Sequence, residues 1–190
     1  MVPKNSGFNF IRDGISKIAK TGSEIINLRA EDIPFILERL PDNGKRFVGI
    51  TGEDLWQNYA LGNSATDLEV KRKLEWADER ALFLKPTLCL LGKKGAKIKT
   101  GKEISVAINA KYSLLAGKFL SKYEDRGVKF NKIVINGSVE TTFAIGLADM
   151  VIDIVYSGKT FREQNLAILE NIFSSNIVVL GKKGGKNENL

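Results

Sequence analysis

Histidine is absent from the 190-residue sequence, and cysteine occurs once, as Cys89. Without histidine, imidazole acid–base catalysis, histidine metal ligation and a Ser-His-Asp triad are excluded. One cysteine excludes a disulfide framework within the chain and a cysteine cluster for zinc, so the default expectation is a reducing cytoplasm. Cys89 stands in the apolar run 88–91, and we interpret it as a core residue rather than a nucleophile.

Long apolar runs are also missing. No run approaches the length of a transmembrane helix, and the first residues do not resemble a signal peptide, so we expect no membrane partner. The hydrophobic content of 43% and the charged content of 27% are ordinary for a globular protein. The length suits one large or two small domains.

The net charge is +7, and lysines gather at 93–102 and 182–186. We interpret both groups as solvated loops, although a basic balance also suits anionic substrates or nucleic acid. Neither group is interleaved with aromatic residues, and no helix-turn-helix or RNA-binding signature is present, which disfavours nucleic acid.

Apolar periodicity predicts strands that alternate with helices. Expected strands lie at 1–4, 24–29, 47–51, 82–91, 103–109, 129–135, 150–156 and 177–180, and expected helices lie at 8–20, 31–40, 53–56, 112–123, 141–148 and 162–173. A polar stretch at 57–66 is expected to be irregular, and Thr66 to Glu69 is a capping-box candidate. This alternation predicts an α/β fold with largely parallel sheets.

The lysine-rich loop near residue 95 is the expected domain boundary. The last helix and strand can return to the first half of the chain. We therefore expect a discontinuous domain of residues 1–95 plus 170–190, a second domain of residues 96–169, and a cleft between them.

The stretch 134–165 is the most informative part of the chain. It predicts strand, loop, helix, strand, loop and helix, and ligands of open α/β sheets bind at loops that follow strands. In the second loop, Ser157-Gly158-Lys159-Thr160, glycine permits a close approach of the backbone, and lysine and hydroxyl groups suit a phosphate. Equally, Thr160 and Glu163 fit a capping box that starts the helix, and the spacing alone leaves both interpretations open.

Asp153 ends the second strand beside this loop. A carboxylate there is placed to accept hydrogen bonds from sugar hydroxyls. The loop does not match a Walker A motif, which requires glycine where Asp153 stands.

Several motifs in this stretch resemble the signature of ATP phosphoribosyltransferases. They are Glu140, then Gly146-Leu147-Ala148-Asp149 after five residues, Val151, Asp153 and Ser157-Gly158-Lys159-Thr160. Fainter similarities cover most of the chain, at Pro3-Lys4, Leu28-Arg29, Asp32-Ile33-Pro34, Val48 to Gly52 with Asp54, and Lys111-Tyr112.

The resemblance implies a two-lobed fold similar to periplasmic binding proteins, with mixed, largely parallel sheets and a central cleft. It implies transfer of phosphoribose from phosphoribosyl pyrophosphate to N1 of ATP, the first step of histidine biosynthesis, with Mg2+ carried by the substrate phosphates and no metal site on the protein. The chain is similar in length to the short form of the enzyme, which implies a homo-oligomer, a histidyl-tRNA-synthetase-like regulatory subunit, or both.

The resemblance also assigns residues. Ser157, Gly158, Lys159 and Thr160 would hold the 5′-phosphate, and Asp153 and Glu140 would be catalytic at the ribose, where Asp153 binds its hydroxyls. Contacts to ATP or pyrophosphate are implied for Lys4, Arg29 and Asp54.

Two elements depart from the family pattern. Pro-Lys-Gly-Arg becomes Pro3-Lys4-Asn5-Ser6, and Thr-x-Tyr-Pro becomes Ala110-Lys111-Tyr112-Ser113. The phosphoribose half of the pattern is therefore better preserved than the ATP half. A non-catalytic sensor of a phosphorylated ligand, or a partner subunit of the same fold, is the alternative function.

Overall fold

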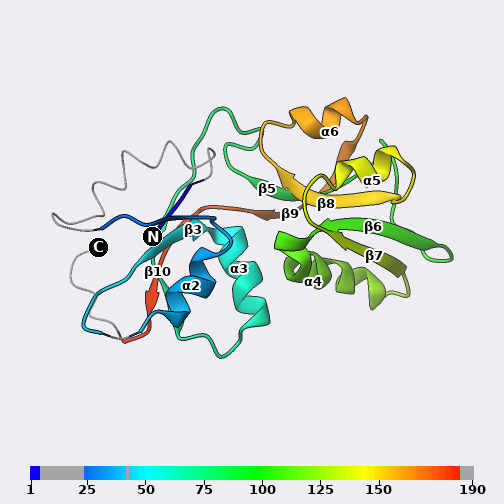
Figure 1. Cartoon of the computed structure of the whole chain (residues 1–190). Helices are drawn as coiled ribbons and strands as arrows, with labels where there is room; N and C mark the ends of the chain where they lie inside the picture. The colour runs from blue at the N-terminus through cyan, green and yellow to red at the C-terminus, as the bar shows by residue number, and fades with distance from the viewer. Residues whose placement is uncertain (5–23, 42, 185–190) are drawn as a thin grey trace. The chain divides into compact units, whose positions relative to one another are not determined.

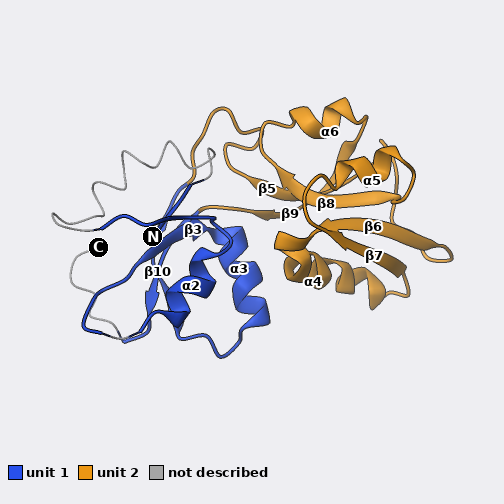
Figure 2. Cartoon of the chain, in the orientation of Figure 1, with its two compact units in different colours: residues 1–75, 177–190 blue, residues 76–176 orange. Residues whose placement is uncertain are grey.

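A computed structural model describes residues 1–4, 24–41 and 43–184 of the chain. The chain forms two compact units, residues 1–75 with 177–190 and residues 76–176 (Figure 2). The helix expected at 8–20 and the departure at Asn5-Ser6 lie outside the described residues. No helix in the described ranges is long and apolar enough to span a bilayer.

The first unit contains two groups of strands. Strands β1 (Val2–Pro3) and β2 (Asn27–Leu28) pair in parallel, and β10 (Ile177–Lys182) pairs antiparallel with both β3 (Gly49–Gly52) and β4 (Leu68–Leu74). The terminal amino group of Met1 donates to the carbonyl of Val48, and the N–H of Ile50 donates to the carbonyl of Met1. This alternation is the pattern of neighbouring parallel strands, so β1 also runs parallel to β3.

Two helices, α2 (Ile33–Arg39) and α3 (Glu53–Gly62), pack on strands β3 and β10 of the three-stranded sheet. Pro34 stands in the first turn of α2, where the missing N–H of proline costs no helical hydrogen bond. A Cβ on Gly49 would lie 2.5 Å from the side chain of Ile33, so glycine is what lets β3 approach α2. Buried residues from both helices and from the strands form the core of the unit: Leu37, Trp56, Leu68, Val178 and Leu180.

The second unit is built on a five-stranded sheet of order β7-β6-β8-β5-β9. The strands are β5 (Thr87–Gly92), β6 (Glu103–Asn109), β7 (Lys129–Ile135), β8 (Met150–Val155) and β9 (Ala167–Ser174). Strand β6 is parallel to β7 and β8, whereas β5 is antiparallel to β8 and β9. The mixed α/β class is confirmed, with parallel pairing in this unit confined to β7, β6 and β8.

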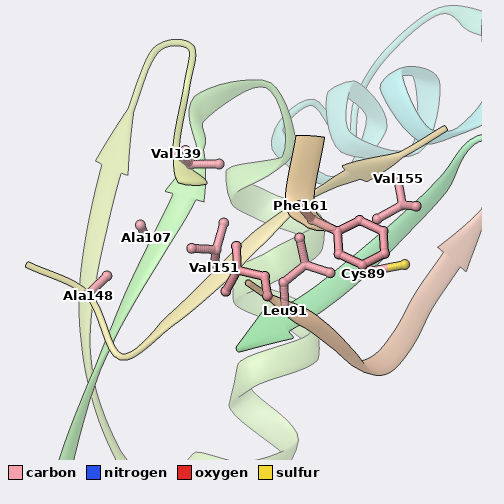
Figure 3. Packing of buried hydrophobic residues seen from close by; sticks show 9 residues of the cluster. Cys89, Leu91, Ala107, Val139, Ala148, Val151, Val155 and Phe161 are labelled. Carbon is pink, nitrogen blue, oxygen red and sulfur yellow. The ribbon is translucent and has the colours of Figure 1, made fainter. Parts of the chain in front are cut away.

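Helices cover both faces of this sheet. Helix α4 (Ser113–Glu124) lies on one face, and the short helices α5 (Glu140–Ala144) and α6 (Lys159–Glu163) lie on the other (Figure 1). Side chains from the strands meet Val139 and Phe161 in one buried cluster beneath α5 and α6 (Figure 3). Cys89 belongs to this cluster and is fully buried, and burial raises the pKa of its thiol to about 12, as suits a core residue.

Several expectations from the sequence are wrong. The strand expected from residue 82 begins only at Thr87. The segment expected as a helix at 162–173 forms only the end of α6 and then strand β9, because it pairs with β5. The capping-box candidate at Thr66 leads into strand β4 rather than a helix, because β4 pairs with β10. The polar residues that follow Trp56 continue helix α3 to Gly62.

The domain boundaries also differ from those expected near residues 95 and 170. Strand β5 lies before residue 95 but is hydrogen-bonded between β8 and β9. Strand β9 extends past residue 170 in the same sheet. The second unit therefore takes all of residues 76–176, and only β10 returns to the first unit.

Candidate functional site

The carboxyl ends of three parallel strands define one edge of the second unit's sheet. Strand β6 runs in the same direction as β7 and β8 and lies between them. The segments that follow these strands, 110–112, 136–140 and 156–160, therefore start from the same edge. Ligands of open α/β sheets bind at such an edge, which makes it the candidate site.

Asp153 is the central acidic group of this edge. Ile108 of β6 is the register partner of Ile152 in β8, so Asn109 and Asp153 follow at the same level. Nδ2 of Asn109 donates to Oδ1 of Asp153 over 3.2 Å, and the backbone N–H of Ile154 donates to the same oxygen over 2.8 Å. The carboxylate is thus held in place from both strands.

The surroundings of Asp153 disfavour its charge. Burial of the carboxyl raises the pKa of Asp153 to about 6, and the charge of Glu140 acts in the same direction. The hydrogen bonds from Ile154 and Asn109 and the charge of Lys111 oppose the rise. Glu140 is the first residue of α5, where a helix terminus favours a carboxylate. The predicted pair of acids is therefore brought to one place, with a lysine beside it.

The loop that follows β8 has an unusual backbone. Gly158 has a φ of 77°, in the left-handed region that side chains disfavour. A Cβ there would lie 3.0 Å from the ring of Phe161, so glycine serves both the turn and the close packing. The side chains of Ser157, Lys159 and Thr160 are exposed, and Oγ of Ser157 accepts from the N–H of Lys159 over 3.4 Å.

The capping-box interpretation of Thr160 is wrong, because the residue before the helix is Gly158 and Thr160 already lies inside the helix. The hydroxyl of Thr160 instead belongs to the first turn of α6. Lys159 lies 3.9 Å from Glu163, an exposed pair of the kind that contributes little. Since α6 has five residues, its dipole is weaker than the expected long helix would provide.

The residues predicted to contact ATP lie in the first unit. Lys4 directly follows β1 and Arg29 directly follows β2, and Pro3 pairs in register with Leu28. Both cationic side chains are exposed at the carboxyl ends of adjacent parallel strands. Asp54 lies in the first turn of α3, just beyond β3 and thus towards the same edge, but it is 4% exposed.

Two residues near Asp153 were not assigned from the sequence. Asn109 ends a strand that the sequence predicted, between the two strands whose loops drew attention. Lys111 follows it in a short 3-10 turn, whose start is stabilised by the side chain of Asn109. The available signal was a polar residue, Asn109, at the end of a predicted strand. Its importance follows only once the strand order is known, because that order puts β6 next to β8.

A bound metal would have few protein ligands here. Within the described parts of the chain, no group of three or more acidic, cysteine or histidine side chains could hold an ion. The pair of Asp153 and Glu140 offers two carboxylates at most.

The chain is similar in sequence to known proteins. An ATP phosphoribosyltransferase from Oceanobacillus iheyensis is 31% identical over 150 residues, which cover 79% of this chain and 62% of that protein. The chain spans about half the length of the curated relatives it matches, between 35% and 62% for four of them.

Solved structures show the same fold. One chain of the ATP phosphoribosyl transferase (HisG:HisZ) complex from Thermotoga maritima aligns with a TM-score of 0.66 at 22% identity, covering 95% of this chain and 85% of that one. The alkanesulfonate-binding protein SsuA from Xanthomonas axonopodis pv. citri aligns with a TM-score of 0.52 at 13% identity, covering 96% and 64%. The expected likeness to periplasmic binding proteins is thereby confirmed. The model of the family described as "HisG: ATP phosphoribosyltransferase" matches residues 29–189, and the chain belongs to that family.

Proposed function

We propose that the chain transfers phosphoribose from phosphoribosyl pyrophosphate to N1 of ATP, the first step of histidine biosynthesis. One observation carries this proposal. The hydrogen-bonded pair of Asn109 and Asp153, the acid Glu140 and the loop Ser157–Thr160 share one edge of the sheet in a chain of this family.

The loop Ser157–Thr160 is the proposed 5′-phosphate site. It offers two hydroxyl groups, one ammonium group and the backbone at Gly158. All of them follow Asp153 in the chain, in the loop just after β8. Phosphate oxygens accept hydrogen bonds from such donors, and an ammonium group compensates part of their charge. With the phosphate there, the ribose would extend towards the two carboxylates.

Asp153 and Glu140 are the proposed ribose-binding and catalytic acids. Their oxygens would accept hydrogen bonds from the ribose hydroxyls and fix the sugar for attack at C1′. The lone pair of N1 forms the new bond to C1′, the bond from C1′ to pyrophosphate breaks, and its electron pair leaves with pyrophosphate. Ionised carboxylates near the sugar stabilise the positive charge that develops on the ring.

Lys4 and Arg29 are the proposed contacts for the triphosphate of ATP or for pyrophosphate. Both are exposed cations at one strand edge, so they can approach one polyanion together. Asp54 is a weaker candidate than the sequence suggested, because its carboxylate is buried.

Mg2+ is proposed to arrive with the substrate phosphates. Two carboxylates, Asp153 and Glu140, do not complete the six oxygen ligands that Mg2+ prefers, whereas phosphates and water supply the rest. The ion would neutralise charge on the leaving pyrophosphate.

A regulatory subunit similar to histidyl-tRNA synthetase, a homo-oligomer, or both, is proposed as the partner. The support is the related Thermotoga maritima structure, which is a complex of HisG with HisZ.

The test measures binding and turnover separately. Calorimetry with phosphoribosyl pyrophosphate and with ATP should show both bind, and pyrophosphate release should require both, with and without the synthetase-like subunit from the same genome. Binding of phosphoribosyl pyrophosphate without ATP binding or turnover would replace the transferase by a sensor. Absence of any binding would end both proposals.

A further inference from the structure

Residues 76–86 form a closed segment between β4 and β5 to which no function has yet been assigned. Its centre is Asp78, whose carboxylate is 6% exposed. Arg80 donates to that carboxylate from its backbone N–H at 3.0 Å, from Nε at 2.9 Å and from Nη2 at 2.7 Å. A carboxylate with this many donors is fixed in orientation.

The backbone of the segment is closed on the same residue. The N–H of Asp78 donates to the carbonyl of Leu84 over 2.8 Å, and the N–H of Ala81 donates to the carbonyl of Asp78 over 2.9 Å. Leu84 has a φ of 62°, a left-handed conformation that leucine rarely adopts. Such strain persists only where surrounding contacts impose it, so the shape of the segment is strongly specified.

Two bonds connect this segment to Tyr156 at the end of β8. The Tyr156 hydroxyl donates to Oδ2 of Asp78, and the N–H of Leu82 donates to the carbonyl of Tyr156 over 2.7 Å. Both the side chain and the backbone of Tyr156 are therefore held. The next residue in the chain is Ser157, the first of the proposed phosphate loop.

The other end of the loop is held by packing. Phe161 follows Thr160 and is buried in the cluster beneath α5 and α6, together with Val155 (Figure 3). The loop Ser157–Thr160 thus spans four residues between two fixed points, Tyr156 and Phe161. A displacement at either point therefore shifts one end of the loop that carries these donors.

We propose that Tyr156 and Asp78 are positioning residues for the phosphate loop, Asp78 acting through Tyr156. This inference rests on the proposed function, in which that loop binds the 5′-phosphate of ribose. Neither residue is assigned contact with the ligand. Their contribution is that the donors of Ser157–Thr160 are placed before the ligand arrives, which saves the cost of ordering them on binding.

The anchor keeps its charge near neutral pH. The hydrogen bonds from Arg80 and Tyr156 hold the pKa of the Asp78 carboxyl well below its usual range. The carboxylate therefore stays ionised where Asp153, with a pKa of about 6, titrates. Loss of the anchor should weaken phosphate binding by the same factor at pH 6 and pH 8.

The experiment compares Tyr156→Phe with Tyr123→Phe. Tyr123 donates its hydroxyl to Glu170, so the control removes the same kind of bond between α4 and β9, away from the loop. Ribose 5-phosphate and ATP are titrated separately by calorimetry. For Tyr156→Phe we expect about tenfold weaker ribose 5-phosphate binding and unchanged ATP binding. For Tyr123→Phe both affinities should match the wild type.

Two further measurements separate positioning from general stability. Amide hydrogen exchange without ligand should become faster at residues 157–161 in Tyr156→Phe and should not change there in Tyr123→Phe. Asp78→Asn should weaken binding similarly, and its combination with Tyr156→Phe should be no worse than the stronger single variant, because the two act as one unit.

The outcomes are distinct. Equal ribose 5-phosphate affinity and equal loop exchange in Tyr156→Phe and wild type would overturn the inference, as would equal losses in both tyrosine variants. If the wild type binds neither ribose 5-phosphate nor phosphoribosyl pyrophosphate, the proposed function fails and the inference loses its ligand. The exchange measurement still decides whether Tyr156 anchors the loop.

Discussion

The amide of Asn109 donates to the carboxylate of Asp153 across 3.2 Å and joins the ends of strands β6 and β8. Asn109 also accepts the N–H of Lys111, so one side chain fixes both the acid and the turn that carries the nearby lysine. The bond favours the ionised form of Asp153 against the effect of burial.

Replacing Asn109 with alanine should therefore shift the pH dependence of substrate binding. Without the donor, the pKa of Asp153 should rise above about 6, so less carboxylate is ionised near neutral pH. A hydrogen bond to a charged group contributes about 1.5–3 kcal/mol, which would raise the pKa of Asp153 from about 6 to about 7–8. Since less carboxylate is then ionised, affinity for phosphoribosyl pyrophosphate at pH 7 should fall by about two- to fifteenfold. Calorimetry at several pH values between about 5.5 and 8.5 measures the shift, because a carboxyl group with a pKa between about 6 and about 8 changes its charge in this range.

Asn131→Ala is the matched control for Asn109→Ala, because Nδ2 of Asn131 donates over 3.3 Å to a hydroxyl, that of Ser105, instead of a carboxylate. Its pH profile should equal that of the wild type. Superposition of the Asn109→Ala profile on that of the wild type would show that the bond does not tune Asp153.

Asp153→Asn should abolish turnover and stabilise the fold. The pKa of Asp153 rises from 3.8 to about 6 on folding, so between these values the native state binds more protons than the unfolded state. The free energy of unfolding that Asp153 contributes therefore falls as the pH rises from about 3.8 to about 6. Above that range the destabilisation by the buried carboxylate has its full size. Asparagine removes the cost, and the free energy of unfolding at pH 8 should increase by about 1–3 kcal/mol.

Urea unfolding of Asp153→Asn and of the wild type at about pH 4, 6 and 8 measures whether the variant is the more stable protein. The difference between the two proteins should be small at pH 4 and largest at pH 8. A variant that is less stable than wild type at pH 8 would show that the carboxylate is a net stabilising group.

Gly158→Ala should damage both the fold and the phosphate loop. The left-handed φ of 77° costs a residue with a Cβ about 1–2 kcal/mol, and the added Cβ would lie 3.0 Å from Phe161. Gly95→Ala is the control, because Gly95 has a φ of 80° but its Cβ would have no neighbour within 4 Å. Gly158→Ala should lower the free energy of unfolding more than Gly95→Ala does. Of the two variants, only Gly158→Ala should weaken ribose 5-phosphate binding. Equal losses would assign the whole effect to backbone strain.

Arg29→Ala should raise about tenfold the KM of the one substrate whose phosphates Arg29 contacts, the effect of one charged hydrogen bond. That substrate is ATP if Arg29 binds the triphosphate, and phosphoribosyl pyrophosphate if it binds the pyrophosphate. Arg39→Ala provides the comparison, since its guanidinium lies 3.5 Å from the ring centre of Phe35 at the end of α2 and has no proposed ligand. Initial-rate kinetics with each substrate varied in turn measures the split. An equal effect on both substrates, or none, would remove Arg29 from the proposed phosphate contacts.

The local elements around the site were predictable from the sequence. Strands β6, β7 and β8 and helix α4 stand close to their expected bounds, because each has a clear apolar period and a polar or glycine-containing boundary. The loop after β8 was found for the same reason. These features depend on neighbours within a few residues.

Strand β9 shows where this approach fails. Its register against β5 shifts twice, between Leu88 and Cys89 and between Leu90 and Leu91. Each irregularity inserts a residue, so the apolar residues of β9 lose the strict alternation of a strand and resemble a helical period. Its partner β5 lies about 80 residues away in the chain, and no local pattern reveals that pairing.

The Asp78 and Tyr156 pair illustrates a second limit. The two residues are 78 positions apart, and each alone is an ordinary acidic or aromatic residue. Their importance depends on which segment folds against the end of β8, which the strand order determines.

Strand β10 has a consequence for how the protein matures. It is the middle strand between β3 and β4, yet it follows the whole of residues 76–176 in the chain. During synthesis, β3 and β4 emerge early but cannot hydrogen-bond through β10 until the ribosome has made residues 177–182. The second unit has all its strands by then, so the unit that starts first is completed last, and its unpaired edges stay exposed to chaperones or aggregation in the interval.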